Sequence, residues 1–314
     1  MTFQGYYISV EVLFSLLIIF SILIVCTCAF WIISKTNRSE LIDELIIRTN
    51  SWWKMALGIG ILITAPAIVG TIMLSYVSFV ALREMLSIGR FRQADRSALF
   101  AAYFAIPVQY YLAYHNYYHQ FLYFIPLIMF IGLPVMLVIS GNTTLIGRSM
   151  STIPAMLMLT VYMISHMALL FHVAVPGFSG GGGALIIFLI ILTALNDVFQ
   201  FTWGKLLGKR KILPNVSPNK TWEGFVGGVL TTGALGGLLN FLTPLELHES
   251  FIVGLAVGIM GFLGDSIISA VKRDLKIKDT DDLIPGHGGA MDRLDSIVIT
   301  TPMFYHLSSY FISN

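Results

Sequence analysis

Residues 250–295 read SFIVGLAVGIMGFLGDSIISAVKRDLKIKDTDDLIPGHGGAMDRLD, an apolar run that passes without a break into a charged one. The run 250–271 is long enough to span a membrane as a helix, and Asp265 lies inside it. Residues 265–295 hold twelve of the chain's charged side chains, which number 19 basic and 17 acidic. An ionisable residue within a membrane helix costs about 2.5–3.5 kcal/mol on insertion scales, so Asp265 is predicted to be functional.

Composition indicates the same class of protein. The 314 residues are 56% hydrophobic and 11% charged, whereas soluble domains carry about 25% charged residues. We therefore expect an all-α, polytopic integral membrane protein. Two regions are expected within it, an N-terminal transmembrane region over 1–150 and a C-terminal catalytic transmembrane region over 151–314.

Nine apolar runs predict about nine transmembrane helices, at about 20 residues for each span. The run 55–82 contains Pro66 and Gly70, so it is either one long kinked helix or a hairpin of two short ones. The run 99–114 is short, and a count of eight to ten helices stays open. The runs lie at 9–34, 55–82, 99–114, 119–140, 152–174, 184–203, 224–242, 250–271 and 296–312.

The loops between these runs differ in charge. Residues 204–221 carry five basic side chains and no acidic one, and two predicted helices separate them from 272–295. Both segments are therefore predicted to face the same side of the membrane. Counting the predicted helices places a loop with four arginines, at 83–96, on that side as well. The positive-inside rule places these loops in the cytoplasm, so we expect the active site on the cytoplasmic face of a bacterial inner membrane.

Residues 196–224 contain a first polar group that could bind a phosphorylated substrate. Its lysines can neutralise phosphate, its hydroxyls can donate hydrogen bonds, and Ser217 or Thr221 could cap a helix beginning at Trp222, which would be an anion site. A basic loop attracted to anionic lipid explains the same residues about equally well. The candidate members are Asp197, Lys209, Ser217, Lys220, Thr221 and Glu223.

A second polar group follows the run 250–271. Asp265, Ser269 and Lys272 stand at i, i+4 and i+7, so they share one helix face. Cations bound to nucleotide phosphates use one or two carboxylates plus water, and Asp265 and Asp292 are the predicted metal ligands. Asp197 and Asp295 are second choices. Pairing of the acids with nearby lysine and arginine in a solvated loop is the alternative, which suits residues 272–282 better than Asp265.

These segments resemble the signature of the phosphatidate cytidylyltransferase (CDP-diacylglycerol synthase) family. The resemblance covers about 184–296 well and the first half of the chain only in general character. It is carried by SAVKR (269–273), KD (278–279), IPGHGG (284–289) and DRLD (292–295), with ND (196–197) and SPNKTWEG (217–224) upstream.

The resemblance implies transfer of a cytidylyl group from CTP to phosphatidate, giving CDP-diacylglycerol and pyrophosphate in phospholipid biosynthesis. Mg²⁺ is the implied cofactor, and a second cation stays open. The implied partners are CTP, phosphatidate and membrane lipid, with no nucleic acid, and a homodimer stays open. The implied catalytic residues are Asp265, Ser269, Lys272, Asp292 and Asp295. The implied substrate-binding residues are Asp197, Lys209, Ser217, Lys220, Thr221, Glu223, Arg273, Lys278, Asp279, His287, Gly288, Gly289 and Arg293.

Departures from the family pattern leave other functions open. Gln200 and Phe201 replace an Ala-Tyr pair, Asp281 stands where a small residue is usual, and Ala290 replaces a larger aliphatic residue. One alternative is a divergent member that uses another lipid phosphate. Another is a lipid transporter or lipid-binding protein, although transporters show broken helices in repeated halves and here the polar residues crowd into one half.

Overall fold

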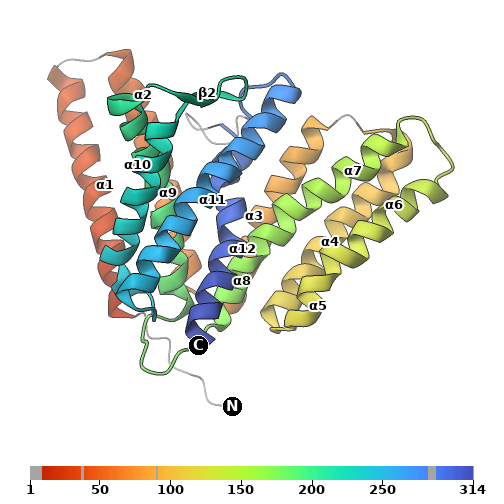
Figure 1. The fold of residues 1–314 in the computed structure, drawn as a ribbon, viewed down its shortest axis with the longest axis horizontal. Coiled ribbons are helices and arrows are strands. Elements are labelled where there is room, and N and C mark those ends of the chain that lie inside the picture. Colours follow the sequence, from red (N-terminus) through yellow and green to blue (C-terminus); the bar gives the residue numbers. More distant parts are fainter. Residues whose placement is uncertain (1–8, 37–38, 90, 282–287, 314) are drawn as a thin grey trace.

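The computed structural model describes residues 9–36, 39–89, 91–281 and 288–313, and the structural statements below concern these residues alone. Most of them lie in helices that run alternately up and down (Figure 1). In this part of the chain, six helical segments are long and apolar enough to cross a membrane, which is consistent with an all-α membrane protein. The count of about nine spans stays a prediction.

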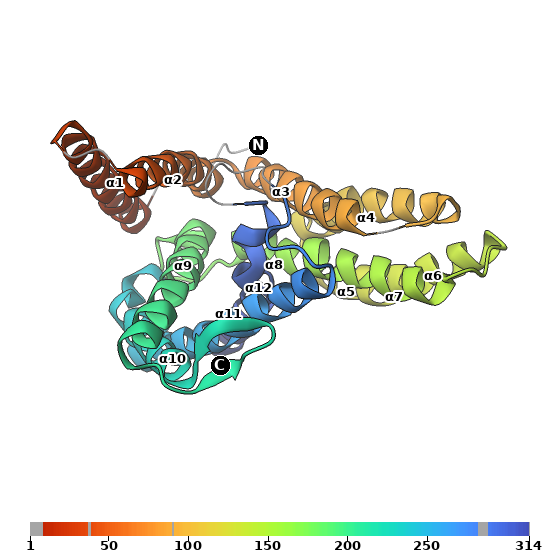
Figure 2. The same ribbon diagram turned by 90° about the horizontal axis from the view of Figure 1, so that it is seen from above.

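The C-terminal half is a bundle of four helices, α9 (Gly181–Leu207), α10 (Trp222–Leu238), α11 (Leu247–Asp274) and α12 (Met291–Ser313). Helix α10 packs against both α9 and α11, and α11 also packs against α12 (Figure 2). A Cβ on Gly236 would stand 2.5 Å from the Ser250 carbonyl oxygen, and one on Gly254 would stand 2.7 Å from that of Thr232. Glycine therefore permits the close approach of α10 and α11, as is common between membrane helices.

The N-terminal half supplies α1 (Val10–Thr36), α2 (Glu40–Thr64), α3 (Ala67–Ile88), α4 (Arg96–Tyr114), α5 (Tyr118–Tyr123), α6 (Phe130–Ile139), α7 (Ile146–Leu157) and α8 (Met163–Leu169). Short π-helical segments join α5 to α6 at Phe124–Met129 and α7 to α8 at Met158–Tyr162, so each pair forms one long helix. The predicted boundary at residue 150 falls within α7, and the division into two regions stays a prediction.

The run 55–82 contains parts of two separate helices, so the alternative of one long kinked helix is wrong, but the two helices are 25 and 22 residues long and not short as the other alternative had it. Helices α2 and α3 meet at Pro66, which precedes α3 and lacks the N–H that a continuing helix would need. Helix α2 begins at Glu40, well before the apolar run, because the Ser39 hydroxyl caps it by accepting the Ile42 N–H. Hydropathy alone does not detect this polar first half of α2.

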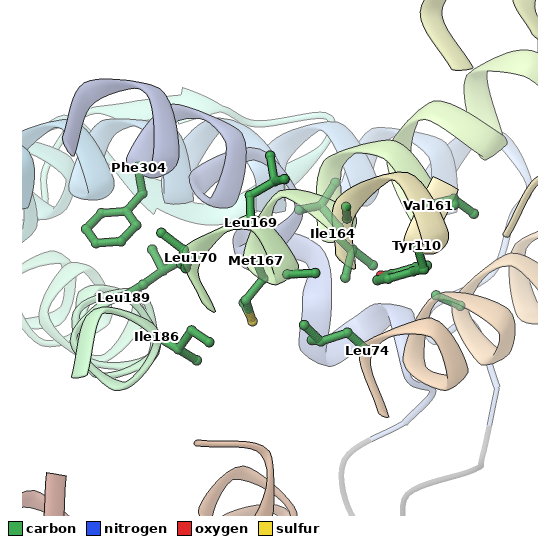
Figure 3. Close-up of a cluster of buried hydrophobic side chains, with 14 of the residues drawn as sticks. Leu74, Tyr110, Val161, Ile164, Met167, Leu169, Leu170, Ile186, Leu189 and Phe304 are labelled. Atoms are coloured by element: carbon green, nitrogen blue, oxygen red, sulfur yellow. The ribbon is translucent and has the colours of Figure 1, made fainter. Parts of the chain in front are cut away.

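A buried apolar cluster joins the two halves (Figure 3). It includes Leu74 of α3, Tyr110 of α4, Ile164 of α8, Leu189 of α9 and Phe304 of α12, none more than 3% exposed. Helix α8 packs on α3, α4 and α12. In lipid such a cluster stabilises by van der Waals packing, because the surrounding acyl chains are equally apolar. Helix α8 thus holds the C-terminal bundle against the N-terminal half.

A two-stranded antiparallel hairpin, which the sequence analysis had predicted only as a basic loop, lies between α9 and α10. Strand β1 (Lys211–Leu213) pairs with β2 (Ser217–Thr221), and the Val216 N–H closes the turn on the Leu213 carbonyl at 3.1 Å. Arg273 at the end of α11 donates from Nε to the Val216 carbonyl at 3.2 Å. This contact confirms that the loops 204–221 and 272–295 share one end of the molecule.

A buried ion pair joins the segment before α4 to the connection between α6 and α7. Asp95 is 0% exposed and accepts hydrogen bonds from Arg92 at 2.6 Å and from the Ser149 hydroxyl at 2.8 Å. Arg92 also donates to the Asn142 carbonyl at 2.8 Å. Burial raises the pKa of Asp95, but the hydrogen bonds from Arg92 and Ser149 and the charge of Arg92 outweigh it, so the pKa lies below its ordinary value.

We expect Asp95→Asn to lower the free energy of unfolding by about 3 kcal/mol near pH 7, because it leaves Arg92 without its counter-charge. Since the folded-state pKa lies below the unfolded one, this stabilisation is present above about pH 4 and is lost as the pH falls through the folded-state pKa. Unfolding of the detergent-solubilised protein at pH 7 and pH 3 measures both effects.

The matched control is Asp274→Asn, which removes an exposed carboxylate at the end of α11. It should change the free energy of unfolding by less than about 0.5 kcal/mol. An Asp95→Asn protein as stable as the wild type at pH 7 would contradict the assigned role of the ion pair.

Candidate functional site

Two lysine–carboxylate pairs lie where the hairpin meets the C-terminal bundle. Asp265 of α11 pairs with Lys220 of β2, at 2.8 Å from Nζ to Oδ2, and accepts the Ser269 hydroxyl at 3.0 Å. That hydrogen bond confirms that Asp265 and Ser269 share a helix face. Lys272, one turn further along α11, instead pairs with Asp292 of α12 at 2.7 Å. The two polar groups of the sequence therefore meet at one place.

A cavity of about 190 Å³ lies beside Asp265, between α9, β2, α10 and α11. Pockets for drug-sized ligands measure about 300–1,000 Å³, so this space suits a phosphate group with its ions rather than a whole nucleotide. One part of its lining is polar and another is aromatic. The polar part includes Asp197, Ser217, Asn219, Lys220, Thr221 and Asp265, and the aromatic part consists of Phe201, Phe225 and Phe262.

Three carboxylates gather near this cavity from three helices. Asp197, Asp265 and Asp295 are close enough to repel one another. Ser296 lies between two of them, because its hydroxyl donates to Asp197 at 3.2 Å and its N–H donates to Asp295 at 2.7 Å. Repulsion of this kind is relieved by a bound cation, which favours the charged form of each acid.

The donor set near the cavity fits Mg²⁺, which prefers oxygen ligands and retains several waters when it binds a nucleotide. Within the described ranges, no group of three His, Cys, Asp or Glu side chains is arranged to hold a metal ion. A site completed by substrate phosphates needs only one or two protein carboxylates. Asp265 with Asp197 meets that requirement. The predicted metal ligands Asp265 and Asp292 stay predictions.

Asp292 is placed differently from the other acids. It is 9% exposed, and its Oδ1 is held by Lys272. Its Oδ2 accepts the Thr280 N–H at 2.8 Å and the Gly289 N–H at 3.0 Å, and it lies 3.0 Å from the Thr280 hydroxyl. A metal on Asp292 would have to displace one of these donors. The carboxylate therefore holds together the residues on either side of the 282–287 segment.

The other predicted residues have several local roles. Thr221 caps α10, as predicted, because its hydroxyl accepts the Gly224 N–H at 3.1 Å. Glu223 accepts the backbone N–H groups of Lys209 and Arg210 at 3.0 and 3.2 Å, so it fixes the loop that precedes β1. His287 lies outside the described residues. The exposed members are Lys209, Arg273, Lys278, Asp279 and Arg293.

Glu84, an acid of α3 that is 1% exposed, was not among the residues predicted from the sequence. Its carboxylate accepts the Ala290 N–H at 2.7 Å, the Met291 N–H at 3.0 Å and the Thr280 hydroxyl. The signal in the sequence is an acid two residues beyond the apolar run 55–82, within a loop that otherwise reads as basic. Glu84 brings the N-terminal half into contact with the site.

Two glycines permit this crowding of carboxylates. Gly288 has a φ of +77°, in the left-handed region, and a Cβ there would stand 2.7 Å from Asp292 Oδ2. A Cβ on Gly289 would stand 2.5 Å from the Thr280 hydroxyl and would overlap the Glu84 carboxylate. Both glycines were predicted as substrate-binding residues, and in the structure side chains of the protein itself lie close to them.

The fold and the site together describe a helical membrane protein whose lysines and carboxylates can bind a phosphate group with a cation. A sequence model of the cytidylyltransferase family matches residues 46–311. The chain belongs to the cytidylyltransferase family, and the resemblance noted in its sequence is confirmed.

The chain is similar to the uncharacterized protein YnbB of Escherichia coli (strain K12), with 36% identity over 270 residues, 85% of this chain and 88% of that protein. It is also similar to phosphatidate cytidylyltransferases of Bacillus subtilis (strain 168), 38% identical over 118 residues, and Aquifex aeolicus (strain VF5), 43% identical over 112 residues. These matches cover 37% and 35% of this chain and only 44% and 42% of those two proteins.

We expect Gly289→Ala to lower the free energy of unfolding by about 1–3 kcal/mol, because the added methyl group overlaps Glu84 and Thr280. Thermal unfolding in detergent measures the change. The control is Gly58→Ala in α2, where a Cβ meets nothing within 4 Å. It should be neutral or stabilise by up to about 1 kcal/mol through higher helix propensity. Equal stability of the two variants would contradict the tight packing around Gly289.

Proposed function

We propose that the chain transfers the cytidylyl group of CTP to a lipid phosphate, with phosphatidate as the acceptor, giving CDP-diacylglycerol and pyrophosphate. The observation that carries this proposal is the Lys220–Asp265 pair beside a cavity that Asp197 also lines. Membership of the cytidylyltransferase family and the similarity to named phosphatidate cytidylyltransferases support the reaction type.

The reaction forms one bond and breaks one. A phosphate oxygen of the lipid attacks the α-phosphorus of CTP, and the bond from that phosphorus to the bridging oxygen of the β-phosphate breaks, so pyrophosphate leaves. The lipid phosphate is already ionised at neutral pH, and no general base is required. Because both reactants are anions, catalysis consists mainly of neutralising charge and aligning the attack.

Two lysines of the chain contribute to that neutralisation. Lys220 extends over the Phe262 ring, 4.4 Å from its centroid, and reaches the mouth of the site beside Asp265. Lys272 stands one helical turn beyond Ser269 and contributes a second positive charge. Asp265 and Asp197 would hold Mg²⁺, which when bound supplies further neutralisation of the phosphate oxygens. Asp265 thus connects the cation site to the phosphate-binding lysine.

The aromatic lining of the cavity supports a lipid acceptor. Phe201 of α9 is 67% exposed and lies at the same cavity as Lys220. The phosphate group of a lipid can therefore contact Lys220 while the acyl chains of the same lipid lie along the apolar surface of α9 and α10. We further propose that the hairpin end faces the cytoplasm, because its loops carry most of the basic residues.

A second candidate is transfer of the same group to another lipid phosphate. Two of the departures from the family pattern, Gln200 and Phe201, line the cavity. Gln200 donates to the Asn196 side chain at 3.0 Å and to the Gly258 carbonyl at 3.3 Å, so its position is fixed. These residues are where a changed acceptor preference would arise.

The test is pyrophosphate release by the purified protein in detergent with CTP, Mg²⁺ and phosphatidate. We expect Asp265→Asn to reduce turnover by about 100-fold or more, because it removes a cation ligand and the partner of Lys220. Asp274→Asn, an exposed change near the end of the same helix, should remain within twofold of the wild type. Size-exclusion chromatography checks that both variants stay folded.

Each outcome decides between the candidates. Full activity of Asp265→Asn would refute the assigned site. Turnover with a different lipid phosphate, but not with phosphatidate, would select the second candidate. Inactivity with every acceptor would favour a lipid-binding or transport role.

A further inference from the structure

Glu84 contacts the candidate site from the other half of the protein. It lies near the end of α3, whereas its hydrogen-bond partners Thr280, Ala290 and Met291 lie 196, 206 and 207 positions later in the chain. The side chain is 1% exposed, and both of its oxygens accept hydrogen bonds. A buried carboxylate with this many donors fixes whatever backbone supplies them.

The backbone that Glu84 fixes is the beginning of α12. Met291 is the first residue of α12, and Ala290 precedes it, so both donated N–H groups belong to the helix N-terminus. The first N–H groups of a helix lack partners within the helix, and the helix dipole favours a negative charge there. Glu84 supplies that charge from α3.

Asp292 is the next residue of α12 and is linked to Glu84 through Thr280. The Thr280 hydroxyl faces both Glu84 Oε1 and Asp292 Oδ2, and a hydroxyl has a single proton to donate. The Thr280 N–H also binds Asp292, at 2.8 Å. Thr280 and Gly289 therefore hold the Asp292 carboxylate, which in turn holds the ammonium group of Lys272.

We propose that Glu84 is a positioning residue of the cytidylyl-transfer site. Its carboxylate fixes Thr280 and the start of α12, and so holds Asp292 against Lys272 and sets the direction in which Asp295 leaves the helix. This inference rests on the function proposed above. It assigns the N-terminal half a part in catalysis, although none of the side chains described for that half lines the cavity.

Glu84→Gln tests the proposal, because the amide keeps the shape of the side chain but turns an NH₂ group toward N–H donors. The matched control is Asp95→Asn, which removes another fully buried carboxylate of the N-terminal half whose partners, Arg92 and Ser149, lie away from the site. Both variants should lower the thermal midpoint of unfolding. A general loss of folded protein lowers the rate of both but leaves the Mg²⁺ concentration at half-maximal rate unchanged.

Two measurements separate positioning from stability. We expect Glu84→Gln to raise the Mg²⁺ concentration at half-maximal rate by at least fivefold, and Asp95→Asn to leave it within twofold. Hydrogen–deuterium exchange, which needs no activity, should become at least tenfold faster for Glu84→Gln in peptides covering 288–294 and stay unchanged there for Asp95→Asn.

An unchanged exchange rate at 288–294 or an unchanged Mg²⁺ requirement in Glu84→Gln would overturn the proposal. Equal effects of Asp95→Asn on both measurements would also overturn it, because loss of any buried acid would then suffice. A wild-type protein without cytidylyl transfer would refute the proposed function itself. The exchange measurement would then still decide whether Glu84 fixes the start of α12.

Discussion

The structure depends on the compensation of several carboxylates at one end of a helical bundle. Asp265 is balanced by Lys220, Asp292 by Lys272, and Glu84 by the N-terminus of α12. An uncompensated charge in such surroundings would cost several kcal/mol. Each partner comes from a different element, so the hairpin, the end of α11, the start of α12 and the end of α3 are held in register by their charges.

Through Glu84, the N-terminal half also contacts the candidate site directly. The apolar cluster around α8 packs the two halves against each other. At this separation the Glu84 side chain of α3 contacts the start of α12. Packing within lipid provides little directional specificity, because the competing acyl chains are also apolar. The hydrogen bonds at Glu84 provide the direction. Packing and polar contacts therefore have separate tasks in joining the two halves.

Much of the fold could be predicted from residue type and spacing. Hydropathy located most of the helices, although one run, 55–82, covered parts of both α2 and α3. The i, i+4 spacing placed Ser269 against Asp265. The first half of α2 was not predicted, since it is polar and depends on the Ser39 cap. The hairpin at 211–221 was not predicted either, because strands this short depend on tertiary contacts such as the one from Arg273.

The sequence predicted many of the charged residues at the candidate site, but fewer of the hydrogen bonds and ion pairs that join them. Asp265, Lys220 and Lys272 were all predicted from the sequence, and the structure pairs Lys220 with Asp265 and Lys272 with Asp292. Glu84 was missed because its partners are backbone N–H groups of a distant segment, and backbone donors leave no signal in side-chain patterns. For the same reason, the sequence did not indicate that backbone N–H groups of Thr280 and Gly289 donate to Asp292, a carboxylate that was predicted to bind a metal.

The exposed Phe201 beside the cavity has a consequence for how substrate supply would be measured. An acceptor that arrives along this wall travels within the plane of the bilayer, whereas CTP arrives from water. The two reactants are then counted in different ways, the lipid as a mole fraction of the membrane surface and the nucleotide as a molar concentration. Diluting the acceptor with inert lipid would slow the proposed reaction at constant bulk concentration, so its rate would follow the lipid composition of the membrane.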